Sequence, residues 1–191
     1  MRIIAGSAKG SRIFAPKGQD TRPTQDRVRE SLFNRIQGDV SDAVVLDLFS
    51  GSGALALEAL SRGAQKAVMV DAATEAADCI RRNVEKLGFE ARGQLLKCQW
   101  EAAVSRLCGQ GIAFDLVFID PPYHMTDTRG IMESLARAGI LAEGALLVVE
   151  HRKGAQPAAH PLFEQRSMRA YGDTEVSIWQ YDPLPEQNAE E

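Results

Sequence analysis

The 191-residue sequence has few cysteines, few histidines and no long hydrophobic run. Its three cysteines form no C-x-x-C pair and its three histidines are too sparse for a ligand cluster, so we expect neither a disulfide nor a bound metal. The apolar run at residues 3–5 is much shorter than a signal peptide, and no later segment is as apolar as a membrane span. We therefore expect a cytoplasmic protein, without a membrane segment and monomeric.

Positive charge is also lacking on average, because the net charge is -4. The charge is unevenly spread, however: residues 1–37 hold eight Arg or Lys and three acids, a net charge of +5, which leaves -9 for the remainder. Phosphate contacts need clustered cations rather than a basic average, so a basic segment on an acidic body favours a local anionic partner such as a nucleic acid. A solvated surface without a partner is the alternative.

The length and the 45% hydrophobic content fit one globular domain. From residue 43 on, short apolar runs alternate with segments of helical periodicity, which is typical of a parallel sheet with helices on both faces. The predicted strands are 43–49, 66–71, 93–98, 114–120 and 144–151, and the predicted helices are 54–62, 74–87, 101–107 and 128–138. Gly172-Asp173 lies between the runs 162–171 and 175–181 and predicts a hairpin, so we expect a seven-stranded, mostly parallel sheet with a terminal antiparallel pair.

The sequence divides into three parts. Residues 1–37 form a basic arm and a helix, which Thr24 is expected to cap and whose Val28, Leu32 and Ile36 would face the body. Residues 38–182 form the α/β domain, which would hold any catalytic site. Residues 183–191 form an acidic tail that we expect to be disordered.

A glycine-rich loop, Asp47-Leu-Phe-Ser-Gly-Ser-Gly53, follows the first predicted strand. Glycine at such a turn lets the backbone approach a nucleotide-like ligand. Gly51-x-Gly53-x-x-Ala56 fits the dinucleotide fingerprint, and Asp71 lies where a ribose-binding acid belongs, so the loop alone leaves NAD and S-adenosylmethionine open. Asp47 favours S-adenosylmethionine, because an acid attracts that ligand's cationic groups and repels a pyrophosphate. Asp71 could instead be a helix N-cap.

A second loop, Asp120-Pro-Pro-Tyr123, ends the fourth predicted strand. The Asp120 carboxylate and the Pro121 carbonyl could accept the two hydrogens of an exocyclic amine, while Pro121 and Pro122 restrict the backbone. Tyr123 could then stack on a flipped-out base. The alternative is a turn that ends the strand with a packing tyrosine.

Both loops resemble known motifs. Asp120-Pro-Pro-Tyr123 resembles the motif of amino-group methyltransferases that act on bases or glutamine, and residues 46–53 resemble their first motif. The segments Arg2-Ile-Ile-Ala-Gly, Lys9-Gly-Ser-Arg12, Arg22-Pro-Thr and Arg27-Val-Arg-Glu-Ser-Leu-Phe-Asn34 resemble the RsmD family of bacterial 16S ribosomal RNA guanine-N2 methyltransferases. The resemblance implies a class I, Rossmann-like methyltransferase that uses S-adenosylmethionine and acts on 16S rRNA in the assembled or assembling small ribosomal subunit.

Motifs and resemblance together give the candidate site. The expected catalytic residues are Asp120, Pro121, Pro122 and Tyr123. The expected cofactor-binding residues are Asp47, Phe49, Gly51, Gly53, Asp71, Gln99 and Asp120. Gln99 stands where related enzymes usually have an acid or asparagine near the adenine, and it can still hydrogen-bond that ring. The expected RNA contacts are Lys9, Arg12, Arg22, Arg27, Arg152 and Lys153.

Two other functions remain open. One keeps the chemistry but acts on adenine or cytosine of DNA or on a protein glutamine; such enzymes more often have Asn than Asp before the prolines and usually carry a recognition domain. The other is a module that binds S-adenosylmethionine or NAD without turnover. A pure binder would have no need of the acid, prolines and aromatic ring at residues 120–123.

Overall fold

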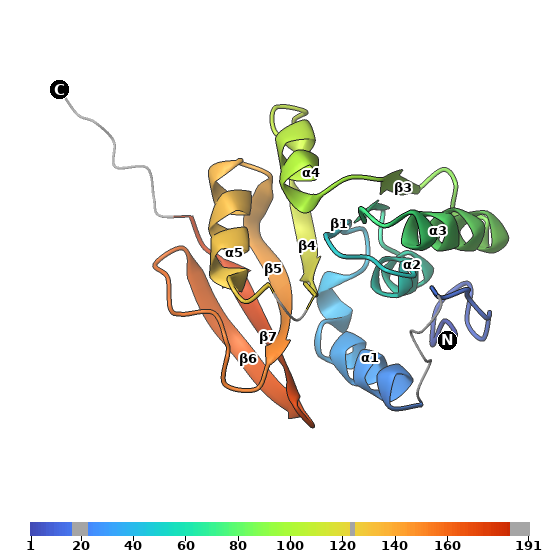
Figure 1. The fold of residues 1–191 in the computed structure, drawn as a ribbon, viewed down its shortest axis with the longest axis horizontal. Coiled ribbons are helices and arrows are strands. Elements are labelled where there is room, and N and C mark those ends of the chain that lie inside the picture. The colour runs from blue at the N-terminus through green and yellow to red at the C-terminus, as the bar shows by residue number, and fades with distance from the viewer. Residues whose placement is uncertain (17–22, 123–124, 184–191) are drawn as a thin grey trace.

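The computed structural model describes residues 1–16, 23–122 and 125–183, and gives only the backbone of residues 23–25. Within these residues one sheet has seven strands in the order β3-β2-β1-β4-β5-β7-β6 (Figure 1). The strands are β1 (Val44–Asp47), β2 (Lys66–Val70), β3 (Gly93–Leu96), β4 (Phe114–Ile119), β5 (Leu141–Arg152), β6 (Phe163–Tyr171) and β7 (Thr174–Tyr181). The helices are α1 (Pro23–Arg35), the 3-10 turn η1 (Gln37–Asp39), α2 (Ala54–Ser61), α3 (Thr74–Leu87), α4 (Trp100–Leu107) and α5 (Thr128–Arg137).

Strands β1 to β5 are parallel, whereas β7 is antiparallel to both β5 and β6. The predicted fold class is thereby confirmed, and most element ends agree with the prediction within two residues. β5 is the exception, because it begins at Leu141, beyond a register shift in its pairing with β4. The carboxyl ends of the parallel strands meet at one edge, here called the carboxyl edge. The strand order reverses between β1 and β4, which is where ligands bind in open α/β sheets.

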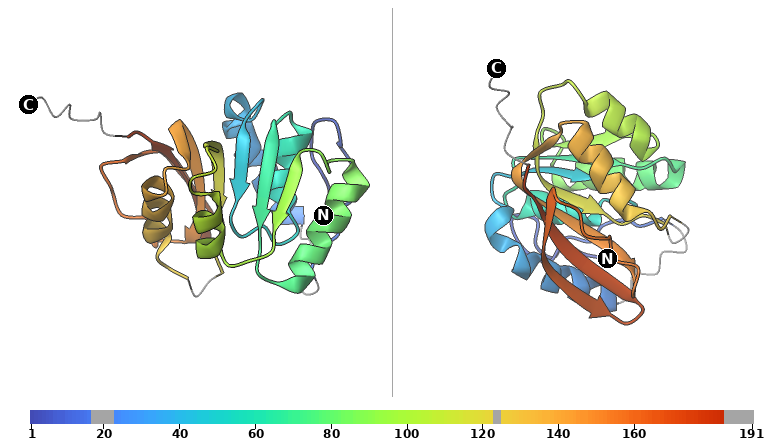
Figure 2. Two further views of the ribbon diagram at one scale, coloured as in Figure 1. Left: turned by 90° about the horizontal axis from the view of Figure 1, so that it is seen from above. Right: turned by 90° about the vertical axis from the view of Figure 1, so that its left-hand side faces the viewer.

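Helices cover both faces of the sheet (Figure 2), and an apolar core lies on each face. On one face, buried residues of α1, α2 and α3 pack against the strands, and Phe33 of α1 meets Phe118 of β4 with ring centroids 5.9 Å apart. On the other face, buried residues of α4 and α5 pack against the strands. Strands β1, β2 and β4 are therefore buried on both faces, as their nearly continuous apolar sequences predict.

Helix α1 begins at Pro23, so the prediction that Thr24 caps it is wrong. Proline is favoured at the first helical position because the amide that it lacks would have no partner inside the helix. Leu32 and Ile36 are buried as expected, and Val28 is half-buried.

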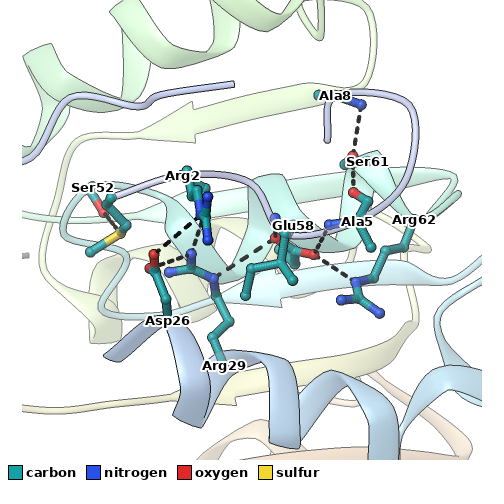
Figure 3. Close-up of polar contacts among 11 residues, drawn as sticks. Arg2, Ala5, Ala8, Asp26, Arg29, Ser52, Glu58, Ser61 and Arg62 are labelled. Carbon is teal, nitrogen blue, oxygen red and sulfur yellow. Dashed lines mark hydrogen bonds and ion pairs between the residues drawn. The ribbon is translucent and has the colours of Figure 1, made fainter. Parts of the chain in front are cut away.

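The basic arm, residues 1–16, packs against α2 and α3. Ile3 and Ile13 are buried in the same core as the sheet. Figure 3 shows how the fully buried Glu58 of α2 fixes the arm: its carboxylate accepts hydrogen bonds from the amides of Ile4 (2.7 Å) and Ala5 (3.0 Å). Gly6 has a φ of +83°, and a Cβ there would lie 1.8 Å from the Ser61 carbonyl oxygen, so no other residue fits this close approach.

Three sequence expectations concern absences. The three cysteines, which all lie in the described part of the chain, are free. Among the described residues no group of His, Cys, Asp and Glu could hold a metal ion, and no helix there has the length and hydrophobicity of a membrane span.

Candidate active site

The glycine-rich loop is fastened to β2 by Ser50. The Ser50 hydroxyl donates to the Asp47 carbonyl (2.8 Å) and accepts from the Val70 amide (3.2 Å), and the Ser50 amide donates to the Val70 carbonyl (3.0 Å). Gly51 and Gly53 have φ angles of 54° and 78°. The loop therefore leaves β1 in a fixed left-handed turn that brings its backbone to the carboxyl edge.

Gly53 is needed for packing as well as for the turn. A Cβ at this position would lie 3.2 Å from the Met69 sulfur and 3.3 Å from a Leu57 methyl, both inside the core. Sequence reasoning assigned Gly53 to close approach by a ligand, whereas the structure shows an additional close approach between α2 and the sheet.

Asp71 joins the two loops that border the site. Its Oδ2 accepts from the Gly51 amide and its Oδ1 from the Ala73 amide, each at 2.9 Å. The N-cap of α3 is Ala73, so Asp71 is not the cap of that helix. A carboxylate oxygen can accept two hydrogen bonds, so both oxygens of Asp71 keep a lone pair for ribose hydroxyls.

Asp47 is buried at the end of β1, with 1% of its surface exposed. Its Oδ2 has no hydrogen-bond partner among the described residues. Burial, and then the charge of Asp120, raises the pKa of Asp47 to about 7, although hydrogen bonds from Ser50 and Ala56 oppose the shift. Burying such a group without a partner is costly, so this position suits a cationic ligand group.

Asp120 follows β4 on the same face of the sheet as Asp47. Asp47 pairs in register with Phe118, so Asp120 lies one side-chain repeat farther toward the carboxyl edge. Its side chain is accessible to solvent, yet the protein atoms around it raise its pKa to about 6 by desolvation. Pro121 is half-buried and Pro122 exposed, and Tyr123 lies outside the described residues.

Sequence reasoning missed Glu150, the third acid at this edge. Ile119 of β4 pairs with Val149 of β5, so Glu150 is the lateral neighbour of Asp120. Burial, followed by the charge of Asp120, raises the pKa of Glu150 to about 8. The sequence could have indicated Glu150, because it is an acid near the end of the fifth predicted strand. In that segment, however, only Arg152 and Lys153 were considered.

On the face of the sheet opposite to Asp47 and Asp120, the residues near the glycine-rich loop form an apolar surface that could contact a flat ring. Phe49, Leu96, Cys98 and Trp100 are half-buried there against the core beneath α4 and α5. Gln99 is exposed and is the N-cap of α4, but its side chain makes no capping hydrogen bond. The side-chain amide of Gln99 is therefore free of a capping hydrogen bond. The prediction that Gln99 binds adenine requires this.

The predicted RNA contacts lie in two groups. Lys9, Arg12 and Arg27 are exposed, and Lys9 and Arg27 line one groove with Arg2, Asp26 and Glu30. Arg152 and Lys153 are exposed at the end of β5, where the Lys153 amide donates to the Asp173 carbonyl of the hairpin. Arg22 lies outside the described residues.

Two cations on α3 extend the first group and were not predicted. Arg82 and Lys86 both lie over the ring of Phe14, at 3.7 and 5.0 Å from its centroid. Lys86 also donates to the Arg12 carbonyl (2.7 Å). The sequence did not show this because the contact joins residues more than sixty positions apart.

Known proteins resemble this chain over most of its length. The family described as conserved hypothetical protein 95 matches residues 1–180. The chain belongs to this family. "Ribosomal RNA small subunit methyltransferase D" of Escherichia coli (strain K12) is 37% identical over 154 residues, 78% of this chain and 74% of its own. The resemblance to the RsmD family is thereby confirmed.

Other relatives cover nearly the whole chain. YlbH of Bacillus subtilis (strain 168) is 33% identical over 94% of this chain and 98% of its own. The solved structure of yhhF from Escherichia coli is 32% identical, with a TM-score of 0.83, over 95% of this chain and 98% of that chain. The likeness thus includes the basic arm and the terminal hairpin as well as the two loops.

Proposed function

We propose that this protein transfers a methyl group from S-adenosylmethionine to the N2 amine of a guanine in 16S rRNA of the small ribosomal subunit. The observation that carries the proposal is the placement of a buried carboxyl group lacking a partner for one oxygen, Asp47, beside Asp120 at the switch point of the sheet. The Escherichia coli relative, named as a small-subunit rRNA methyltransferase, supports methylation of small-subunit rRNA.

The residues present fit the cofactor. Asp47 would bind its cationic amino-acid end, Asp71 its ribose hydroxyls, and the Gly51 turn would let the chain pass closely beside it. Gln99 would hydrogen-bond the adenine next to Phe49. When bound, the cofactor supplies an electrophilic methyl group on a sulfonium.

Asp120 and Pro121 would prepare the nucleophile. The N2 amine of guanine shares its lone pair with the ring and must pyramidalise before it can attack. Hydrogen bonds from its two N–H groups to the Asp120 carboxylate and the Pro121 carbonyl favour this geometry. The N2 lone pair, positioned in this way, would accept that methyl group, and the electron pair of the former S–C bond would stay on the sulfur. The nitrogen sheds one proton, which Asp120, with a pKa raised to about 6, can accept.

Energetically, orientation of the amine toward the methyl group is the largest contribution, up to ~7–11 kcal/mol. Extracting the base costs a few kcal/mol, and stacking on Tyr123 would return ~1–3 kcal/mol. The exposed cations of the arm and of the β5 end would hold the RNA backbone, together with Arg22, which precedes Arg27 by five positions in the sequence.

The test is methyl transfer from labelled S-adenosylmethionine to four acceptors: small subunits from cells lacking the enzyme, protein-free 16S rRNA, DNA, and total protein. We expect label in the RNA, with assembled subunits accepting more than naked RNA. Label in DNA or in a protein glutamine would replace this proposal with the other amino-methyltransferase functions, and no transfer at all would leave a binding module.

A further inference from the structure

Glu150 lies directly across from Asp120 on the neighbouring strand, and both side chains project from the same face of the sheet. Strand β5 continues beyond the end of β4, and Glu150 follows Val149, the partner of Ile119. Val148, two positions earlier, is buried on the face covered by α1, so Glu150 projects from this same face. Adjacent strands lie roughly 4.7–4.9 Å apart, which puts the two carboxyl groups within reach of one base.

The surroundings of Glu150 leave it available for a ligand. No hydrogen bond to its side chain occurs among the described residues. On its other side β7 presents Val176, which is apolar and buried, and Arg169 of β6 lies exposed in the next strand. Among the described side chains of α1, the exposed charged ones are Arg27 and Glu30. His151 points to the opposite face, where its Nε2 lies 3.1 Å from the Ser177 hydroxyl.

The base that the proposed function requires has a distinctive edge. Guanine presents the O6 acceptor, the N1–H donor and the N2 amine side by side. A neutral carboxyl group offers one donor and one acceptor, which match O6 and N1–H, whereas an ionised carboxylate offers acceptors only. Next to its amine, adenine offers one acceptor, N1, and cytosine offers two acceptors, N3 and O2, so a single neutral carboxyl group can form only one strong hydrogen bond with either base, against two with guanine.

We propose that Glu150 is a specificity-determining residue that, as a neutral carboxyl group, donates to guanine O6 and accepts from N1–H while Asp120 holds N2. The two side chains then present the three-point pairing pattern of cytosine to the flipped-out guanine. This inference rests on the proposed function and adds the group that selects guanine. The pKa of Glu150, raised to about 8, keeps its proton at neutral pH, while Asp120 at about 6 is mostly ionised.

The test compares Glu150→Gln and Glu150→Leu with the full-length wild-type enzyme, using small subunits from cells lacking the enzyme as the acceptor. The Gln amide offers the same donor and acceptor as the neutral acid, so E150Q should lose at most about threefold in kcat/KM at pH 7. E150L offers neither and should lose about tenfold to a hundredfold. E143Q is the control, because Glu143 lies on the same strand but is exposed at the opposite edge of the sheet.

The pH profile separates this role from a structural one. The wild-type Glu150 loses its proton above pH 8, whereas Gln does not titrate, so the ratio of kcat/KM between E150Q and wild type should rise about tenfold from pH 7 to pH 9. Titration of the guanine itself cancels in this ratio. Calorimetric titration should show unchanged affinity for S-adenosylmethionine in both variants.

Three results would overturn the assignment. E150Q as impaired as E150L at pH 7 would mean that an ionised carboxylate is required, and an unimpaired E150L would mean that Glu150 does not touch the base. Weakened cofactor binding in E150L would move Glu150 to the cofactor site. Wild-type methylation of the subunits tests the proposed function itself, so its failure is distinguishable from each of these.

Discussion

Two sets of acids serve this molecule in opposite ways. Glu58 of α2 is fully buried, accepts two amides of the arm and pairs with Arg62 at 2.7 Å and Arg29 at 3.8 Å (Figure 3). At the carboxyl edge, by contrast, Asp47, Asp120 and Glu150 face one another without a basic partner among the described residues, and their pKa values are raised. A fully buried acid with all its partners fixes the fold, whereas acids that the surrounding protein desolvates and that lack partners indicate a place for a ligand.

Glu58→Ala should have the largest effect on stability. It leaves two amides of the arm without their acceptor and removes one of the two carboxylates that pair with the buried Arg29 guanidinium, and loss of one partner of a buried ion pair costs about 3–5 kcal/mol. Urea unfolding measures this. Glu90→Ala, at an exposed position, should change the free energy of unfolding by less than about 0.5 kcal/mol. Equal effects of the two changes would contradict the role of Glu58 in fixing the arm.

Asp120→Ala should have the opposite effect to Glu58→Ala: activity should fall, whereas stability should not. Loss of an acceptor for the reacting amine should lower kcat by about a hundredfold to a thousandfold, while affinity for S-adenosylmethionine stays largely intact and unfolding stability does not fall. Asp71→Ala should mainly weaken cofactor binding. Methyl transfer and calorimetric titration of both variants check this. If both lose cofactor affinity equally, the division of roles between the two aspartates is wrong.

Asp47 predicts a pH dependence of cofactor binding. A carboxyl group with a pKa of about 7 is mostly protonated at pH 6, and a cationic ligand needs its ionised form, so affinity for S-adenosylmethionine should be about tenfold weaker at pH 6 than at pH 8. Asp47→Asn should bind more weakly at pH 8 and remove most of this dependence. A flat wild-type profile would show that Asp47 does not bind the cation.

The same shifts predict how the stability of the cofactor-free protein varies with pH. Because the folded-state pKa values of the three acids lie above their unfolded values near 4, the folded chain binds more protons between about pH 4 and pH 8. Its stability should therefore fall as pH rises through this window. A melting temperature that increases steadily from pH 5 to pH 8 would contradict the assignment of unpaired acids.

The smallest effect concerns the basic arm. Removing Lys9 or Arg27 should reduce the slope of log K against log salt for RNA binding by about 0.7–0.9 for each phosphate that the protein no longer neutralises. Arg81→Ala is the control, because Arg81 is already paired with Asp78. Filter binding at several salt concentrations measures the slopes. Slopes unchanged from wild type would assign Lys9 and Arg27 to the solvated surface.

The two sets of acids also differ in how far the sequence predicts them. Asp47, Gly51 and Asp120 were predictable because each belongs to a short motif at the end of an apolar strand. Glu150 and Glu58 were not, because their roles depend on the register between β4 and β5 and on the docking of the arm onto α2. Both are contacts between distant segments, which local patterns do not encode. Thr24 was misassigned because Pro23 already occupies the first position of α1.

The decisive experiment is nucleoside analysis of small-subunit RNA after methylation by the wild-type enzyme in vitro. We expect one additional N2-methylguanosine, absent when Asp120→Ala replaces the wild type. Methylated adenosine or cytidine in its place would contradict the assignment of guanine and, with it, the pairing role of Glu150.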